Sequence, residues 1–294
     1  MKTVELDVSG SGDGLRVDRF LRDSLPPLST RSIRLALETG EVFSAGKTLS
    51  KGDRVRAGQK IVVRRLAEPS DWQPLPGDVE GASVLFQDGV VAVLDKPEGI
   101  PTEPLSILEA GTLAGFFRWR FPETQDWCLS TGTPLLSRLD FDTSGVVLAA
   151  LTEPAWRELI RQREEAAIGK RYICVVDGMI AEPATLKGTI ESRGGARVRV
   201  RPSIEEPSPV YWTRIFPLAS DGRRTLAAAE ILKGKRHQVR AHLAAAGHPI
   251  VGDTLYGKGE RGRLMLHAAG VTFDHPVSAQ RMTVTSSAPK GFEL

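Results

Sequence analysis

The chain has 294 residues, 41% hydrophobic and 26% charged, which is typical of a globular protein and excludes disordered, collagen-like and coiled-coil chains. At about 150 residues per domain, this length predicts two domains with ample material for a buried core. Lys and Arg (39) nearly balance Asp and Glu (36), but residues 1–65 hold 13 basic and 8 acidic residues, and such a basic part can attract a polyanion through phosphate contacts.

Residues 14–65 are expected to form two helices followed by a small sheet. Apolar residues from Leu15 to Leu25 are spaced as in a helix, and Pro26-Pro27 ends it. Ser29 is a candidate N-cap for a second helix that ends at Gly40. Short strands are expected at 42–43, 47–49, 54–55 and 61–63.

Arginines recur every three residues in both predicted helices, at Arg16, Arg19, Arg22, Arg31 and Arg34. Such stripes fit either a solvated helix face or a phosphate-binding surface. The order of elements resembles the small RNA-binding domain named after a ribosomal small-subunit protein, in Gly14-Leu-Arg-Val-Asp-Arg-Phe-Leu, Leu28-Ser-Thr-Arg-Ser-Ile-Arg and Gly40-Glu-Val. The resemblance implies that Arg31 and Arg34 bind the substrate RNA.

The rest of the chain predicts a linker and a second domain. Residues 66–82 are rich in Pro and Gly without periodicity, so we assign residues 1–65 to a small RNA-binding domain, 66–82 to the linker and 83–294 to a catalytic domain. Asp88-Gly89 predicts a hairpin; further strands are expected at 146–151, 172–176, 186–192 and 196–201, and helices at about 105–120, 154–167 and 237–246. Many hairpins and few helices favour an α+β fold with a mixed, largely antiparallel sheet.

A polar turn, Ser137-Arg-Leu-Asp-Phe-Asp-Thr-Ser-Gly145, comes directly before an apolar strand. Asp and Thr before a strand often make local turns. This stretch also resembles the catalytic signature of the RluA-type pseudouridine synthases, in which Arg-Leu-Asp is followed by Thr-Ser-Gly. The resemblance implies that Asp140 is the catalytic aspartate.

Further motifs of the same family follow in the same order, so the resemblance covers roughly residues 14–280. They are Lys96-Pro-Glu-Gly99, Lys170-Arg-Tyr172, Gly234-Lys-Arg-His-Gln-Val-Arg-Ala-His-Leu243, Gly247-His-Pro-Ile-Val-Gly-Asp253, Leu255-Tyr-Gly257, Leu266-His-Ala268 and His275-Pro276.

The resemblance implies a pseudouridine synthase-like fold and a role for each matching residue. Asp140 acts at the sugar as nucleophile or base, roles that require an ionised carboxylate. Arg240 is the cation that keeps it ionised, and Tyr172 stacks on the uracil and accepts or relays a proton. Leu266 packs near the base, and Arg138 fills the space left when the uridine is flipped out. Thr143 also belongs to the predicted substrate site.

Other interpretations of these residues stay open. Arg240 fits a surface helix and Tyr172 fits the core, and Arg197, Arg199 and Arg201 share one strand face that either contacts phosphates or is solvated. The five histidines match no standard metal spacing, so we expect structural hydrogen bonds. The family pattern is altered at Ser137, Thr102 and Lys235-Arg236, which leaves the target RNA open.

We therefore expect an RNA pseudouridine synthase, an isomerase that needs neither cofactor nor metal. Its predicted partner is structured RNA, ribosomal RNA before transfer RNA, and a monomer is expected. The alternatives are a tRNA-directed synthase, a catalytically inactive RNA-binding protein of the same fold, and a metal-dependent nuclease that uses Asp140 and Asp142. Two distant cysteines, Cys128 and Cys174, with no apolar run of membrane-spanning length or presequence pattern, predict a cytoplasmic protein without membrane insertion.

Overall fold

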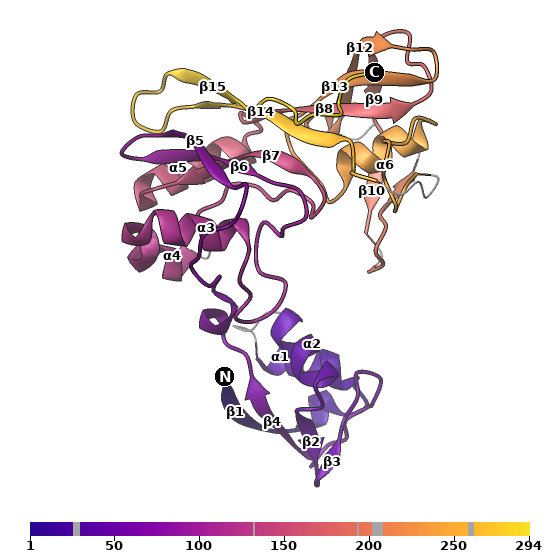
Figure 1. Cartoon of the computed structure of the whole chain (residues 1–294). Helices are drawn as coiled ribbons and strands as arrows, with labels where there is room; N and C mark the ends of the chain where they lie inside the picture. Colours follow the sequence, from indigo (N-terminus) through magenta and orange to yellow (C-terminus); the bar gives the residue numbers. More distant parts are fainter. Residues whose placement is uncertain (26–29, 132, 193, 202–207, 258–261) are drawn as a thin grey trace. The chain divides into compact units, whose positions relative to one another are not determined.

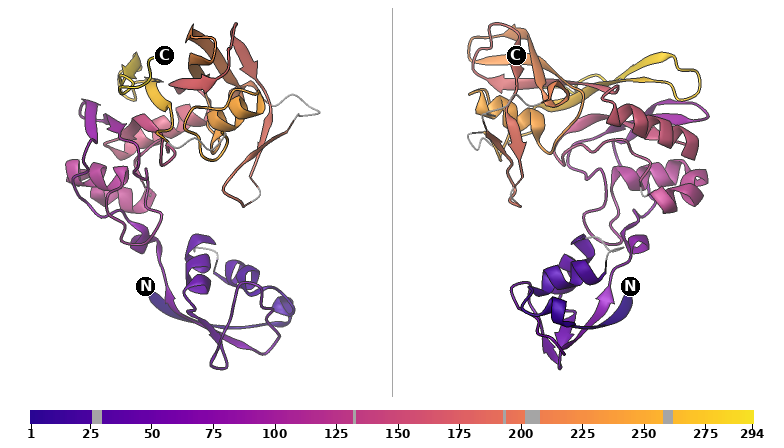
Figure 2. Two further views of the ribbon diagram at one scale, coloured as in Figure 1. Left: turned by 45° about the vertical axis from the view of Figure 1, so that its right-hand side comes forward. Right: turned by 180° about the vertical axis from the view of Figure 1, so that it is seen from behind.

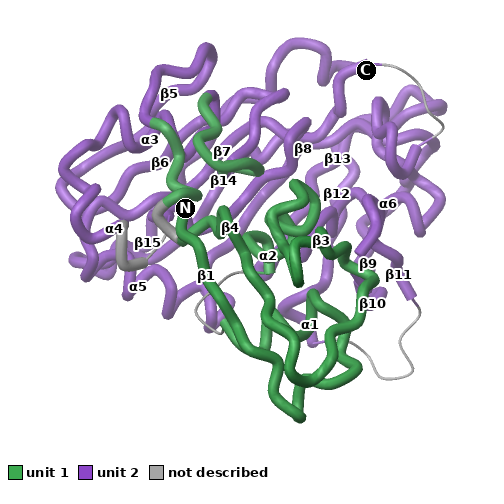
Figure 3. Tube along the Cα trace, turned by 90° about the horizontal axis from the view of Figure 1, so that it is seen from below, with its two compact units in different colours: residues 1–75, 104–110 green, residues 76–103, 111–294 purple. Residues whose placement is uncertain are grey.

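The computed structural model describes residues 1–25, 30–131, 133–192, 194–201, 208–257 and 262–294. The chain divides into two units, residues 1–75 with 104–110 and residues 76–103 with 111–294 (Figure 3). The change between residues 75 and 76 lies inside the predicted linker, 66–82. The segment 104–110, which the sequence assigns to the catalytic domain, belongs to the first unit, where the Pro104 carbonyl accepts a hydrogen bond from Arg31.

The first unit is a four-stranded antiparallel sheet with two helices packed on it. The strand order is β1-β4-β2-β3, and the elements are β1 (Lys2–Asp7), the 3-10 turn η1 (Gly10–Gly12), α1 (Val17–Ser24), α2 (Thr30–Glu38), β2 (Val42–Ser44), β3 (Lys47–Thr48), β4 (Lys60–Leu66) and η2 (Pro69–Trp72). The two predicted helices and three of the four predicted strands are confirmed. The strand expected at 54–55 is wrong, since Arg54 makes a single bridge with Arg16.

Apolar residues from both helices and the sheet form this unit's core. Phe20 and Leu21 of α1 and Ile33 of α2 pack against Val42 and Ile61 of the sheet. Strand β1, which pairs antiparallel with β4, was not predicted, although Val4, Leu6 and Val8 alternate with polar residues as in a strand. The predicted breaker Pro26-Pro27 and the predicted N-cap Ser29 lie outside the described residues.

The second unit is built on a nine-stranded sheet, ordered β5-β6-β7-β14-β8-β13-β12-β9 with β15 beside β14 (Figure 1). Strands β7 and β14 are parallel and the other described pairs are antiparallel, which confirms the mixed, largely antiparallel α+β prediction. The strands are β5 (Ser83–Gln87), β6 (Val91–Lys96), β7 (Ser144–Ala150), β8 (Gly169–Asp177), β9 (Ala184–Leu186), β12 (Thr213–Ser220), β13 (Arg224–Ile231), β14 (Leu266–Asp274) and β15 (Arg281–Thr285). A separate hairpin joins β10 (Thr189–Glu191) to β11 (Arg199–Arg201).

Helices flank this sheet on both faces. Alternate residues of the central strands therefore belong to two different cores. Ala92 and Leu94 of β6 belong to the same core as residues of α3 and α6, whereas Val91 and Val93 belong to the core that includes α5. Figure 2 shows α5 beside the β5–β7 end and α6 near β12 and the β10–β11 hairpin. The helical elements are α3 (Leu113–Arg120), η3 (Pro122–Thr124), α4 (Gln125–Thr131), α5 (Glu153–Glu164), η4 (Pro209–Tyr211) and α6 (Gln238–Ala245).

The predicted helix at 105–120 is wrong over its first eight residues. Gly111 has a left-handed backbone, with φ of +71°, and Thr112 caps α3 by accepting a hydrogen bond from the Gly115 N–H. A capping Thr fixes the start of a helix, so α3 begins at Leu113. None of the helices in the described ranges combines the length and the apolar character that crossing a membrane requires.

Gly145 places β7 against β14, and its replacement by Ala should destabilise the second unit. Its φ is +114°, and an added Cβ would collide with the backbone of Ala268. Strain and overpacking together predict a fall of about 2–4 kcal/mol in the free energy of unfolding, measured by urea denaturation. Gly222→Ala is the matched control, because its φ is +85° but nothing lies within 4 Å of the added Cβ; equal losses in the two variants would contradict the steric argument.

Candidate active site

The loop that carries Asp140 is fixed by two buried side chains from the preceding segment, 96–102. The hydroxyl of Thr102 donates to the Leu139 carbonyl at 2.9 Å and accepts from the Leu139 N–H at 3.0 Å. The Lys96 ammonium donates to the Phe141 carbonyl at 3.1 Å. The residues on both sides of Asp140 are therefore held, which limits the positions its carboxylate can reach.

Asp140 faces a buried arginine, although the two residues are one hundred positions apart in the sequence. Arg240, on α6, has a side chain that is 3% exposed and donates from Nη1 to Oδ2 of Asp140 at 3.0 Å. The Asp140 side chain is 24% exposed, so its carboxylate remains accessible to a ligand. The structure thus brings together two of the three predicted catalytic residues.

A second carboxylate, Asp253, holds Arg240 from the other side. Arg240 donates from Nε and Nη2 to the two oxygens of Asp253 at 2.8 and 2.9 Å. Asp253 in turn accepts hydrogen bonds from the backbone N–H groups of Leu255 and Tyr256, both at 2.9 Å. A bidentate pair of this kind fixes the guanidinium plane, so Nη1 is aimed at Asp140.

Arg240 and Asp253 both stay charged although they are buried. Burial by itself raises the pKa of Asp253, but the hydrogen bonds and charge of Arg240 and the two backbone N–H groups lower that pKa overall. Burial likewise disfavours the charged form of Arg240, whereas Asp253 and Asp140 raise the pKa of Arg240 above its ordinary value. Arg240 is therefore a permanent cation beside the Asp140 carboxylate.

Tyr172 lies in the middle of β8, and only 8% of it is exposed. Burial, with a smaller contribution from the Asp140 charge, raises the pKa of Tyr172 above its ordinary value, so the phenol stays neutral at physiological pH. Leu266 of β14 pairs with Cys174, two residues along β8 from Tyr172. Leu266 and Tyr172 belong to the same core cluster, so they present one apolar surface.

The remaining predicted site residues have different environments. Arg138 is 73% exposed and lies 3.5 Å from Glu103, whereas Thr143 is buried and its hydroxyl has no hydrogen-bond partner within the described ranges. In the first unit, Arg31 stacks on Trp72 at 3.9 Å and donates to the Pro104 carbonyl. Arg34 is exposed and lies 3.5 Å from Glu38.

Asp253 and Lys96 lie in the quoted motifs, but no role was predicted for either. For His237 a structural hydrogen bond was predicted, and its Nδ1 lies 3.0 Å from the Tyr256 hydroxyl oxygen. Thr102 was noted only as a departure from the family pattern, yet its hydroxyl anchors the loop that carries Asp140. The other four histidines make hydrogen bonds, to Thr213 and the Gly188 carbonyl (His242), the Asp177 carbonyl (His248), Ser144 (His267) and Asp88 (His275). Among the described residues, no cluster of His, Cys, Asp and Glu is arranged to hold a metal ion.

Lys96 supports the loop that carries Asp140, although burial disfavours its charged form. Its removal should destabilise the fold. Its buried ammonium donates to the carbonyls of Pro97, Ile100 and Phe141, and burial lowers its pKa to about 8. Lys96→Met would leave three carbonyls without this donor, and we expect the free energy of unfolding to fall by about 2–3 kcal/mol in urea denaturation. Lys51→Met, at an exposed turn, should change it by less than about 0.5 kcal/mol; similar losses in both variants would refute the supporting role.

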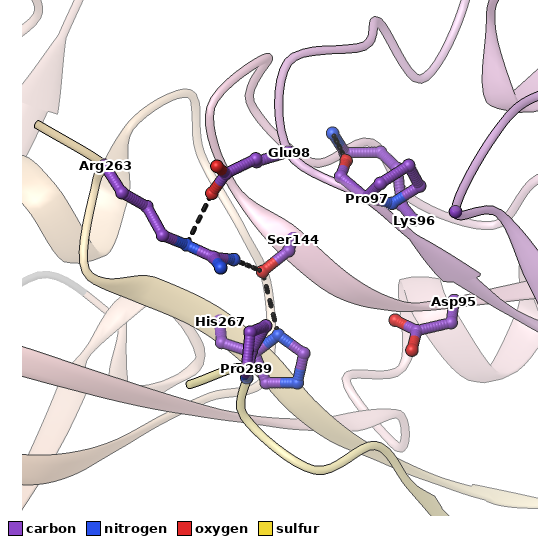
Figure 4. Close-up of a pocket in the computed structure, with 9 residues that line it drawn as sticks. Asp95, Lys96, Pro97, Glu98, Ser144, Arg263, His267 and Pro289 are labelled. Atoms are coloured by element: carbon purple, nitrogen blue, oxygen red, sulfur yellow. Dashed lines mark hydrogen bonds and ion pairs between the residues drawn. The ribbon is translucent and has the colours of Figure 1, made fainter. Parts of the chain in front are cut away.

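A separate cavity of about 240 Å³ is lined by Ser144, the first residue of β7 (Figure 4). Arg263 bridges Glu98 and Ser144 there, and Ser144 bonds to Nδ1 of His267 at 2.9 Å. The residues that line it include neither Asp140, Tyr172 nor Arg240. The cavity is therefore distinct from the candidate active site.

Comparison with solved structures first shows which class of protein has this fold. The solved structure named human RNA pseudouridylate synthase domain containing 1 superposes with a TM-score of 0.58 at 27% identity, over 73% of this chain and 86% of that one. The family model described as RNA pseudouridylate synthase matches residues 90–245. That range contains Asp140, Tyr172 and Arg240.

Two curated relatives are similar over most of their length. The ribosomal large subunit pseudouridine synthase C of Escherichia coli (strain K12) is 31% identical over 95% of this chain and 91% of its own. The RNA pseudouridine synthase YhcT of Bacillus subtilis (strain 168) is 31% identical over 82% of this chain and 77% of its own. The chain belongs to the RNA pseudouridine synthase family, a class of RNA-modifying isomerases.

Proposed function

We propose that this protein isomerises specific uridines to pseudouridine in structured ribosomal RNA, with Asp140 as the catalytic carboxylate. The observation that supports this most directly is the placement of Asp140. Its accessible carboxylate is on an anchored loop and is paired at 3.0 Å with a cation that Asp253 orients. A carboxylate acts as nucleophile or base, and Arg240 supplies a fixed positive charge next to that of Asp140.

The reaction needs a carboxylate but no added atoms. The bond between uracil N1 and sugar C1′ breaks, the base turns within the site, and a bond from C5 to C1′ forms; C5 loses its proton and N1 gains one. Asp140 either attacks C1′ or removes a proton from the sugar, so that the base can leave. Asp140 is restored at the end, and the RNA product is an isomer of the substrate.

Tyr172 is suited to stack on the uracil and to relay its C5 proton. The raised pKa keeps Tyr172 a neutral phenol, and a phenol oxygen is too weak a base to hold a second proton. It therefore takes the C5 proton only as it passes its own hydroxyl proton to water. Leu266 adds apolar contact beside it. We propose that Thr143, whose hydroxyl has no protein partner within the described ranges, hydrogen-bonds the substrate.

The flipped uridine requires contacts outside the pocket itself. Extruding a base costs a few kcal/mol, and the exposed Arg138, two residues from Asp140, is suited to fill the vacated space. We further propose that the first unit binds RNA through its basic charge, with Arg31 and Arg34 at the contact surface. The name of the Escherichia coli relative favours large-subunit ribosomal RNA over transfer RNA.

The test is tritium release from RNA labelled at uridine C5, since this reaction frees that hydrogen. Purified protein is incubated separately with large-subunit ribosomal RNA, small-subunit ribosomal RNA and transfer RNA from cells that lack the protein. We expect release from large-subunit ribosomal RNA alone. Release from transfer RNA alone would overturn the ribosomal assignment, and binding without release from any fraction would overturn the enzymatic one.

A further inference from the structure

His237 precedes α6 in an unusual backbone conformation. Its φ is +54°, in the left-handed region that costs a residue other than glycine about 1–3 kcal/mol unless its surroundings impose it. The turn is imposed here, since the Lys235 N–H donates to the Gln238 side chain at 3.0 Å and the Gln238 N–H donates back to Lys235 at 3.1 Å. Strained residues of this kind concentrate at functional sites.

The ring of His237 faces the catalytic carboxylate. Its Nε2 lies 3.9 Å from Oδ1 of Asp140, whereas the other oxygen, Oδ2, accepts the hydrogen bond from Arg240. The two oxygens of Asp140 therefore have different partners. Hydrogen bonds in an active site are commonly long before substrate binds and shorten in the complex.

Tyr256 is the hydrogen-bond partner of Nδ1 of His237. The Tyr256 oxygen accepts a hydrogen bond from the Val198 N–H at 2.7 Å and lies 3.0 Å from Nδ1 of His237. The Tyr256 hydroxyl can donate its own proton to Nδ1 of His237. The single proton of the neutral imidazole is then on Nε2. Burial, with Arg240 and Arg236, lowers the pKa of His237, which favours the neutral ring.

The same tyrosine also stabilises the other partner of Asp140. The backbone N–H of Tyr256 donates to Asp253, which orients Arg240, and the Tyr256 ring lies 5.5 Å from the Arg240 guanidinium. The side chain of Tyr256 thus acts through His237 on Oδ1, and its backbone acts through Asp253 and Arg240 on Oδ2. Both oxygens of the carboxylate are linked to one residue.

We propose that His237 is a positioning residue for Asp140, that its Nε2–H is directed at Oδ1, and that Tyr256 fixes the tautomer that makes this possible. The inference rests on the proposed catalytic role of Asp140. With Arg240 on one oxygen and His237 on the other, the carboxylate is held in one orientation for attack. The β10–β11 hairpin contributes through the backbone of Val198.

The test compares single-turnover rates and RNA dissociation constants for five variants of the full chain. His237→Ala and His237→Gly remove the ring, and Gly also relieves the left-handed backbone; His237→Gln retains an N–H donor. We expect both ring deletions to lower the single-turnover rate about tenfold, equivalent to about 1.4 kcal/mol, while the dissociation constant changes less than twofold. His237→Gln should recover most of this loss, which a purely structural role would not allow.

Tyr256→Phe should lower the rate about threefold, because His237 then loses the partner that fixes its tautomer. Tyr211→Phe is the matched control, since the contacts of Tyr211 at this turn are made by its ring and its carbonyl, which Phe retains. Unchanged rates in both ring deletions, or a Gln variant no better than Ala at an equal melting temperature, would overturn the inference. Wild-type protein that releases no tritium would overturn the proposed function instead, so the two failures are distinguishable.

Discussion

Replacing Asp140 by Asn is expected to lower the rate of pseudouridine formation by about 10⁴-fold or more, as loss of a catalytic group does in other enzymes. The amide is neutral, so it neither attacks C1′ nor removes a proton from the sugar. The fold should survive, because Arg240 keeps its bidentate pair with Asp253 and Asn preserves the volume of the side chain. Tritium release in a single-turnover assay measures the loss.

The control for Asp140→Asn is Asp142→Asn, which makes the same chemical change two residues along the same loop. Asp142 is exposed, and we expect its variant to keep the wild-type rate within about threefold. Both variants should bind RNA as wild type does, which would separate an inactive enzyme from a misfolded one. A fully active Asp140→Asn variant would exclude Asp140 as the catalytic group, and the nuclease alternative would instead require RNA cleavage that a chelator stops.

The sequence predicts the elements whose local pattern agrees with their final environment. The hairpin at Asp88-Gly89 is one, because the Asp88 carboxylate accepts hydrogen bonds from the N–H groups of Val90 and Val91. Strand β13 is the opposite case. Its run Leu226-Ala-Ala-Ala-Glu230 consists of good helix formers, and it is a strand because β8 and β12 pair with it on both sides. No local pattern carries that information.

The candidate site also contains residues that the sequence predicts and residues whose roles only the structure reveals. Motif resemblance selected Asp140, Tyr172 and Arg240, and the structure places Arg240 in contact with Asp140. The same motifs contain Asp253 and His237, but a sequence gives no distance, so their roles depend on geometry that α6 and the following loop create. Thr102 is a further example, because a departure from the family pattern looks like a loss until its two hydrogen bonds to Leu139 are known.

Asp253→Asn is expected to lower the free energy of unfolding by about 3 kcal/mol, since the buried Arg240 loses its bidentate partner and keeps only the partly exposed Asp140 as a charged partner. Arg240 is 3% exposed and Asp253 is fully buried, so water cannot replace the lost charge. The rate should fall by about 100-fold, because Arg240 is then oriented only by Asp140. Urea denaturation and single-turnover tritium release measure the two effects.

A double variant separates stability from catalysis at this pair. Arg240→Met combined with Asp253→Asn removes both charges, and replacing a buried pair by uncharged groups is often close to neutral for stability. We expect the double variant to recover most of the lost free energy of unfolding, while the rate stays at or below that of Asp253→Asn because Asp140 has lost its cation. Glu153→Gln, which breaks the exposed pair with Arg157, should cost less than about 1 kcal/mol.

Recovery of both stability and rate in the double variant would show that Arg240 and Asp253 act only in folding. Recovery of stability alone would assign the pair to the chemistry, since the core would then be intact and only the charge beside Asp140 would be missing. The physical basis of this contrast is burial: a pair this deep contributes little net stability over apolar groups of the same volume. A charged pair is better explained here by the oriented cation that it places beside Asp140 than by the fold that surrounds it.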